Sequence, residues 1–142
     1  MSTIDARLNT LIRADGIRFW ETLGIEPVFA EPGHVRLQLE MQTALGTFGR
    51  DHVMHGGAIA SLIDSAASAA VRTTQAEGEP LFAAMATTDL NVSYLEAATG
   101  TLIAEAQVVR AGRSVAFATV EVRDAEDRLV ALGRATMSIR RG

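Results

Sequence analysis

One long segment constrains the fold of this chain more than any other. Residues 56–75 read GGAIASLIDSAASAAVRTTQ, and Asp64 is their only charged residue before Arg72. Alanine is the strongest helix former, and a helix that is apolar on nearly all sides is typical of a protein interior. We therefore predict a buried central helix over residues 56–77, on the order of 30 Å long. Gly78 and Pro80 provide its stop signal.

Segments in which apolar and polar residues alternate surround this helix and indicate β-strands. Two short strands are expected before it, over residues 25–30 and 34–41, and four longer ones after it, between residues 82 and 140. In the first of these four, the alternation places on one face Ala86, Thr88, Leu90, Val92 and Tyr94. The connections at residues 111–112 and 124–127 are of hairpin length, so the last three strands should form an antiparallel meander.

The order of these elements predicts an α+β fold, in which a long, curved antiparallel β-sheet wraps around one central α-helix. An N-terminal helical segment over residues 1–23, interrupted near Gly16, precedes the first strand. The chain has 142 residues and no linker-like or repetitive stretch. A single domain over residues 1–142 is therefore expected.

Composition excludes several classes of protein. The net charge is -4, which argues against nucleic acid or an anionic membrane surface as a partner. No apolar run is long enough to span a bilayer and the first residues do not form a secretory signal, so a cytoplasmic protein is expected. The absence of cysteine rules out disulfides and thiolate chemistry. His52 and His55 with Asp51 come nearest to a metal-binding cluster, but further ligands are missing and we expect no metal site.

The carboxylate of Asp64 needs an explanation, because a buried carboxylate costs several kcal/mol unless it is paired, hydrogen-bonded or protonated. One interpretation is structural. Asp64 would then lie at a partly hydrated edge and bond to Ser61, Ser68 or a strand residue. The other interpretation is that Asp64 takes part in chemistry.

The start of the helix supports the second interpretation. His55, Gly56 and Gly57 precede it, so its first backbone N–H groups are not covered by side chains. Such an end favours developing negative charge, for example on a carbonyl oxygen that becomes an oxyanion. Gly57 and Asp64 share one helix face but lie about 10 Å apart by the helical rise. Either the substrate is extended or a second subunit completes the site.

Arginines near predicted turns form a weaker signal. Arg50, Arg110 and Arg113, the last followed by Ser114, do not belong to any known phosphate-loop pattern. They are either solvated turn residues or contacts for a phosphorylated ligand.

Three segments of the chain carry a resemblance to a known family. Residues 55–64, HGGAIASLID, resemble the H-G-G-x6-D signature of the hotdog-fold acyl-CoA thioesterases, in the PaaI-like branch of phenylacetate degradation. Residues 88–95, TDLNVSYL, and 112–117, GRSVAF, are similar to further strands of that family. The resemblance implies a hotdog fold and hydrolysis of a short-chain, medium-chain or aromatic acyl-CoA to the free acid and CoA. Coenzyme A is then part of the substrate, and no cofactor is implied.

The resemblance also implies roles for individual residues. Asp64 matches the catalytic carboxylate, acting as general base or as nucleophile. Gly57 matches the residue whose backbone N–H polarises the thioester carbonyl, and His55 a histidine that positions the substrate or leaving group. Thr87 falls where the family often has a hydroxyl that binds the carboxylate or its water. Contacts with the substrate and its CoA portion are expected from Gly56, Arg50, Arg110, Arg113 and Ser114.

The resemblance further implies a homodimer in which Gly57 of one subunit faces Asp64 of the other, and dimers of such dimers are common in the family. Family members often carry Asn or Gln six residues before the histidine, where this chain has Gly49. Two alternatives therefore stay open. One is a non-catalytic acyl-CoA binder or sensor. The other is a hydratase or dehydratase on the same fold, although its spacing of Asp followed five residues later by His is missing.

Overall fold

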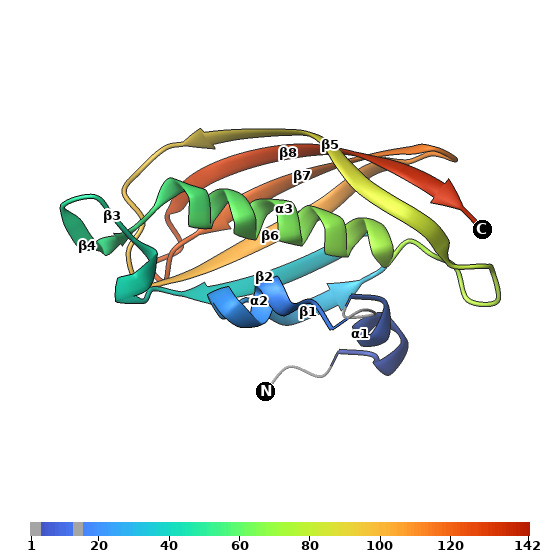
Figure 1. The fold of residues 1–142 in the computed structure, drawn as a ribbon, viewed down its shortest axis with the longest axis horizontal. Coiled ribbons are helices and arrows are strands. Elements are labelled where there is room, and N and C mark those ends of the chain that lie inside the picture. The colour runs from blue at the N-terminus through green and yellow to red at the C-terminus, as the bar shows by residue number, and fades with distance from the viewer. Residues whose placement is uncertain (1–3, 13–15) are drawn as a thin grey trace.

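The computed structural model describes residues 4–12 and 16–142. A curved antiparallel sheet wraps around the long helix α3 (Gly56–Arg72), as Figure 1 shows. The six strands are arranged in the order β1-β2-β6-β7-β8-β5. Their bounds are β1 Glu26–Glu31, β2 His34–Glu40, β5 Phe82–Tyr94, β6 Thr101–Ala111, β7 Val115–Arg123 and β8 Leu129–Arg141. The predicted α+β fold and the antiparallel meander of the last three strands are confirmed.

The remaining elements are short. The predicted N-terminal helical segment forms two helices, α1 (Ala6–Ile12) and α2 (Arg18–Leu23). The predicted residues 1–3 and 13–15 of that segment lie outside the described residues. A 3-10 turn, η1 (Thr43–Leu45), and a small hairpin of β3 (Gly46–Thr47) and β4 (Arg50–Met54) lead into α3. The sequence did not predict this hairpin.

The central helix ends at Arg72 and not at the predicted residue 77. Three consecutive side chains take over the carbonyl groups of its last turn. Thr73 Oγ1 donates to Ala70 O at 2.7 Å, Thr74 Oγ1 to Val71 O at 2.6 Å, and Gln75 Nε2 to Arg72 O at 2.9 Å. Backbone N–H groups of Thr74 and Gln75 also donate to Val71 O and Arg72 O, so side chains and a tightened backbone turn together end the helix.

Helix α3 packs tightly on the concave face of the sheet. Leu62, Ile63 and the neighbouring alanines are fully buried. A Cβ atom at Gly133 on β8 would lie only 2.3 Å from Ile63 Cγ2, so this position has no room for a side chain. The opposite side of the helix is not fully buried, which corrects the expectation that the helix is buried on nearly all sides. Gly57 is exposed there, and Asp64 is half-buried.

Strand β5 forms one edge of the sheet, and an irregularity in it changes which residues face the helix. Its pairing with β8 shifts between Thr87 and Asp89, which leaves Thr88 as an extra residue in a β-bulge. Ala86 pairs with the exposed Ser138, whereas Leu90 pairs with the buried Ala135, so Ala86 does not lie on one face with Leu90 as predicted. Thr87, which pairs with the buried Met137, faces the helix instead.

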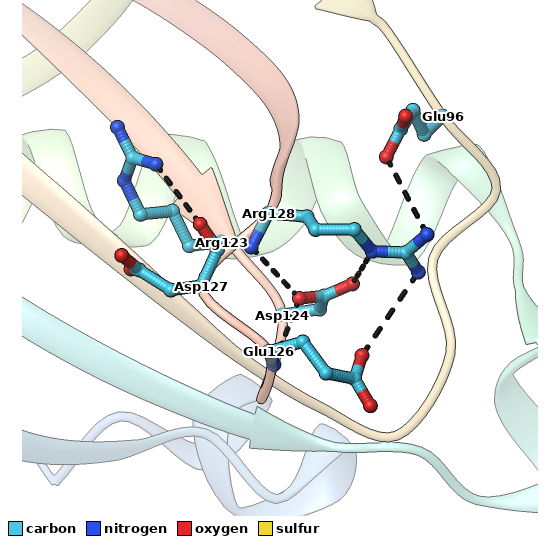
Figure 2. Close-up of polar contacts among 6 residues, drawn as sticks. All are labelled: Glu96, Arg123, Asp124, Glu126, Asp127 and Arg128. Atoms are coloured by element: carbon cyan, nitrogen blue, oxygen red, sulfur yellow. Dashed lines mark hydrogen bonds and ion pairs between the residues drawn. The ribbon is translucent and has the colours of Figure 1, made fainter.

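The turn between β7 and β8 is organised by one buried carboxylate, as Figure 2 shows. Asp124 accepts hydrogen bonds from the backbone N–H groups of Glu126 and Arg128, each at 3.0 Å, and from Arg128 Nε at 2.9 Å. The Arg128 guanidinium also reaches Glu96, in the connection after β5, at 3.9 Å. The turn is thereby tied to the segment that follows β5.

These contacts hold the pKa of Asp124 below its ordinary value, chiefly through the backbone N–H of Arg128 against an opposing cost of desolvation. The ionised form therefore stabilises the fold fully above the pKa of an unfolded aspartate, about 3.9, and this contribution is lost as the pH falls through the lower folded-state pKa. We expect Asp124→Asn to lower the melting temperature at pH 7. Below about pH 3.9 the difference from the native protein should narrow.

Thermal melts over a pH series check this expectation. Asp127→Asn is the matched control, because Asp127 lies in the same turn at a positive φ of 63° that asparagine tolerates. A stability difference for Asp124→Asn that stays constant from pH 7 to pH 3 would contradict the assignment.

Candidate active site

The first turn of α3 is held by its preceding residue. His55 is the N-cap, and its Nδ1 accepts the backbone N–H of Gly57 at 2.8 Å. The backbone N–H of His55 donates to Leu45 O at 2.7 Å, which fixes the histidine to the turn before the hairpin. Because Nδ1 is the acceptor, the neutral ring carries its proton on Nε2. The N–H assigned to the thioester carbonyl thus has an internal partner, the imidazole of His55.

Tyr94, at the end of β5, covers the same turn. Its hydroxyl donates to the carbonyl oxygen of Gly56 at 2.7 Å. A Cβ atom at Gly56 would lie 3.2 Å from the Tyr94 Cζ and Oη atoms, so the glycine allows the ring to approach the helix. The sequence analysis placed Tyr94 on one face of its strand with Leu90 and Val92, and within residues 88–95, which resemble the family, but gave it no role. These two observations were the signals that could have pointed to it.

The carboxylate of Asp64 is bound by the hydroxyl of Thr87, which donates to Oδ1 at 2.7 Å. The bulge at Thr88 makes this contact, since strict alternation would turn Thr87 away from the helix. Asp64 lies two turns after Gly57 on the less buried side of α3. Of the partners expected for Asp64, the structure shows the strand residue, Thr87, whereas Ser61 Oγ donates to Gly57 O at 2.8 Å.

A groove of about 370 Å³ lies beside the start of the helix. Gly56, Ile59 and Tyr94 form part of its wall, and Arg50 of β4 lies at its side. Further lining comes from Thr47, Val53, Met54, Leu95, Glu96, Ala97 and Ala98. Its size is within the range of small-molecule sites, and its lining is mixed, with apolar side chains beside Thr47, Arg50 and Glu96.

The structure does not bring the other predicted substrate contacts to this groove. Arg110, near the end of β6, pairs with Phe117 on the outer side of the sheet. Arg113 and Ser114 lie in the β6–β7 hairpin, beyond the opposite end of α3 from Gly57 (Figure 1). Within one chain Arg50 is thus separated from Arg110, Arg113 and Ser114.

A second hollow, of about 440 Å³, lies on the outer face of the sheet, away from Asp64. Its charged side chains already bind one another: Arg36 lies 2.6 Å from Glu105, and Arg123 lies 2.8 Å from Glu121. Over residues 4–12 and 16–142, no group of three or more potential metal ligands comes together. Within the same ranges, no helix is long and apolar enough to cross a membrane.

Comparison with known proteins decides the family. The family model described as "Thioesterase superfamily" matches residues 51–131, which include both Asp64 and the start of α3. The chain belongs to the thioesterase superfamily. The family and the hydrolase class predicted from the sequence are confirmed.

Relatives of this thioesterase-superfamily chain include a Halobacterium salinarum protein named only as a candidate esterase. The two are 41% identical over 124 residues, which cover 82% of this chain and 81% of the relative. Human acyl-coenzyme A thioesterase 13 is 29% identical over 146 residues, covering 96% of each chain.

Among solved structures, the PaaI protein from the phenylacetic acid degradation operon of Escherichia coli has the same fold. The TM-score is 0.80 at 20% identity, and the match covers 94% of this chain and 92% of PaaI. This likeness confirms the predicted hotdog fold.

The hydrogen bond between His55 and Gly57 yields a prediction about stability. We expect His55→Ala to lower the free energy of unfolding by about 1 kcal/mol, the usual effect of losing an N-cap. His55→Asn should restore most of this loss, because asparagine is a good N-cap. Urea unfolding checks both variants, with the exposed His52 of β4 changed to alanine as the control. If the asparagine and alanine variants are equally destabilised, His55 does not stabilise the helix as its cap.

Proposed function

We propose that the protein hydrolyses an acyl-CoA thioester to the free acid and CoA. The observation that carries this proposal is the Asp64 carboxylate, bound by Thr87 at 2.7 Å on the same side of α3 as Gly57. Membership of the thioesterase superfamily and the likeness to human acyl-coenzyme A thioesterase 13 support it. The acyl group is of short or medium length, or aromatic.

In this proposal Asp64 acts as general base. Its carboxylate takes a proton from water, and the water oxygen attacks the thioester carbonyl carbon. The carbonyl oxygen becomes negative and is stabilised by the Gly57 N–H at the positive end of the helix dipole. The C=O bond then re-forms, the C–S bond breaks, and the CoA sulfur leaves and takes up the proton that Asp64 removed from the water. The alternative is direct attack by Asp64, giving a mixed anhydride that water hydrolyses.

For Gly57 to bind the substrate, the imidazole of His55 has to give up the Gly57 N–H. The substrate carbonyl replaces Nδ1 as acceptor, and the exposed ring of His55 moves aside while staying next to the reacting group. This agrees with the role of His55 in positioning the substrate or leaving group.

Two subunits complete the site in this proposal. Gly57 and Asp64 of one chain are about 10 Å apart by the helical rise, too far to act on the same carbonyl. Strand β5 is a 13-residue edge strand with most of its residues exposed, and such an edge readily pairs with another chain. Exposed apolar side chains, Leu81 at 60% and Leu95 at 49%, flank it at its two ends. A homodimer through β5 covers them and brings Gly57 of one subunit to Asp64 of the other, and two such dimers form a tetramer.

The groove of about 370 Å³ beside Gly56 lies next to the proposed reaction centre. Arg50 is placed at this groove to meet the CoA portion. The end of the subunit that carries Arg110, Arg113 and Ser114 lies far from its own groove. In the proposed dimer this end lies near the partner's groove, so these residues contact the CoA bound there. The acyl preference depends on how the partner closes the groove.

A second candidate is a non-catalytic acyl-CoA binder. Gly49, where the family often has a side-chain amide, lies in the β3–β4 hairpin with φ of 75° and open space around the position of a Cβ atom. A glycine offers no side-chain donor for the carbonyl. A binder would keep acyl-CoA affinity without turnover.

Thiol release from a panel of short-chain, medium-chain and aromatic acyl-CoAs tests the proposal. We expect turnover by the native protein and a loss of at least about 100-fold in Asp64→Asn, the scale of a missing general base. The melting temperature of Asp64→Asn should stay close to that of the native protein, because the amide oxygen can still accept from Thr87 and a partly buried charge is removed.

Asp89→Asn is the matched control, since Asp89 is an exposed carboxylate on the outer side of the same strand. It should retain full activity. Acyl-CoA binding without turnover in the native protein would contradict the hydrolase proposal and favour the binder.

A further inference from the structure

The peptide group between Gly56 and Gly57, at the start of α3, is hydrogen-bonded through both its carbonyl oxygen and its N–H. The carbonyl of Gly56 and the N–H of Gly57 belong to the same planar unit. The Tyr94 hydroxyl donates to the carbonyl oxygen at 2.7 Å, and His55 Nδ1 accepts from the N–H at 2.8 Å. The amide assigned to the substrate carbonyl is therefore the middle member of a chain of three hydrogen-bonding groups.

Only one of the two partners of this amide has to leave it when substrate binds. His55 must release the N–H when a substrate carbonyl takes its place. Tyr94 binds the other end of the peptide group, its ring lies against Gly56, and nothing in the proposed reaction displaces it. The hydroxyl therefore stays on the Gly56 carbonyl while the substrate is bound.

A donor on the carbonyl oxygen also changes the N–H at the other end of the amide. It draws electron density toward the oxygen and leaves the N–H more positive. Hydrogen bonds in such a chain strengthen one another by roughly 10–30% each. The same bond fixes the direction in which the N–H points, because the amide is planar.

We propose that Tyr94 is a positioning residue for the acyl carbonyl: through the Gly56 oxygen it orients the Gly57 N–H and makes it a stronger donor. The inference rests on the proposed function in one respect, that this N–H polarises the thioester. Tyr94 itself does not touch the reacting atoms.

The first test is spectroscopic and does not depend on hydrolysis of a substrate. In the ¹H–¹⁵N spectrum of the free protein, the Gly57 amide proton should move upfield in Tyr94→Phe, which keeps the ring and removes the hydroxyl. Thr22→Val is the matched control. It removes a hydroxyl that likewise donates to a backbone carbonyl, Arg18 O at 3.1 Å, but lies on α2 and does not line the groove. The Gly57 resonance should stay in place in this control.

A second test makes the Tyr94 hydroxyl a stronger donor without a change of sequence. Tyr94 is the only tyrosine in the chain, so growth on 3-fluorotyrosine alters this position alone. Fluorination makes the phenol a stronger donor, and the Gly57 amide proton should then move downfield. If Tyr94→Phe and fluorotyrosine both leave this resonance unchanged, or move it in the same direction, the proposal is overturned.

The kinetic test uses the best acyl-CoA of the panel. Tyr94→Phe should lower kcat by about 3- to 10-fold, a fraction of the effect of removing an oxyanion donor altogether, with KM changed by less than about twofold. Thr22→Val should match the native protein. An unchanged kcat, or a loss confined to KM, overturns the role of Tyr94. Absence of turnover in the native protein, with the Gly57 resonance still responding to Tyr94, would instead overturn the proposed function and leave the link between the two residues standing.

Discussion

The close packing of α3 against the inner face of the sheet determines where every other group of the site lies. Ile63 presses on β8 where Gly133 leaves no space for a Cβ atom, and alanines fill much of the rest of the contact. A helix with larger side chains would lie further from the sheet. Because α3 sits so close, a hydroxyl as short as that of Thr87 reaches the carboxylate of Asp64 from β5.

One irregularity of β5 and one contact at its end convert this packing into a site. The bulge at Thr88 reverses the alternation of β5 and turns Thr87 toward the helix. At the other end of the strand, Tyr94 keeps the inward direction and reaches the first helical residue, Gly56. One edge strand therefore contacts both the carboxylate and the amide of the proposed reaction, and an error in its register would disturb both together.

The sequence was sufficient for the large elements and for the chemistry-bearing residues of the helix. Hydrophobic periodicity predicted α3 and the meander, and the resemblance of residues 55–64 pointed to Asp64, Gly57 and His55. The predicted face of β5 was wrong at Ala86, because a bulge depends on pairing with β8 and leaves the alternation pattern intact. The helix end was misplaced because Thr73, Thr74 and Gln75 bind its last carbonyls through side chains, which composition does not reveal. The bond between Tyr94 and Gly56 joins residues far apart in the chain, so only the folded structure brings it into view.

The central claim is that the carboxylate and the amide acting on one substrate come from different subunits. Co-expression of Asp64→Asn with Gly57→Pro tests it most directly, since proline removes the N–H and fits the first helical turn once the exposed His55 ring, 3.0 Å from the added Cβ, moves aside. In a two-fold symmetric dimer, a mixed pair contains one site with both groups intact, so the co-expressed protein should recover up to about a quarter of native acyl-CoA hydrolysis. Each variant alone should be inactive. A mixture that contains mixed dimers and stays as inactive as its parts would contradict a site shared between subunits.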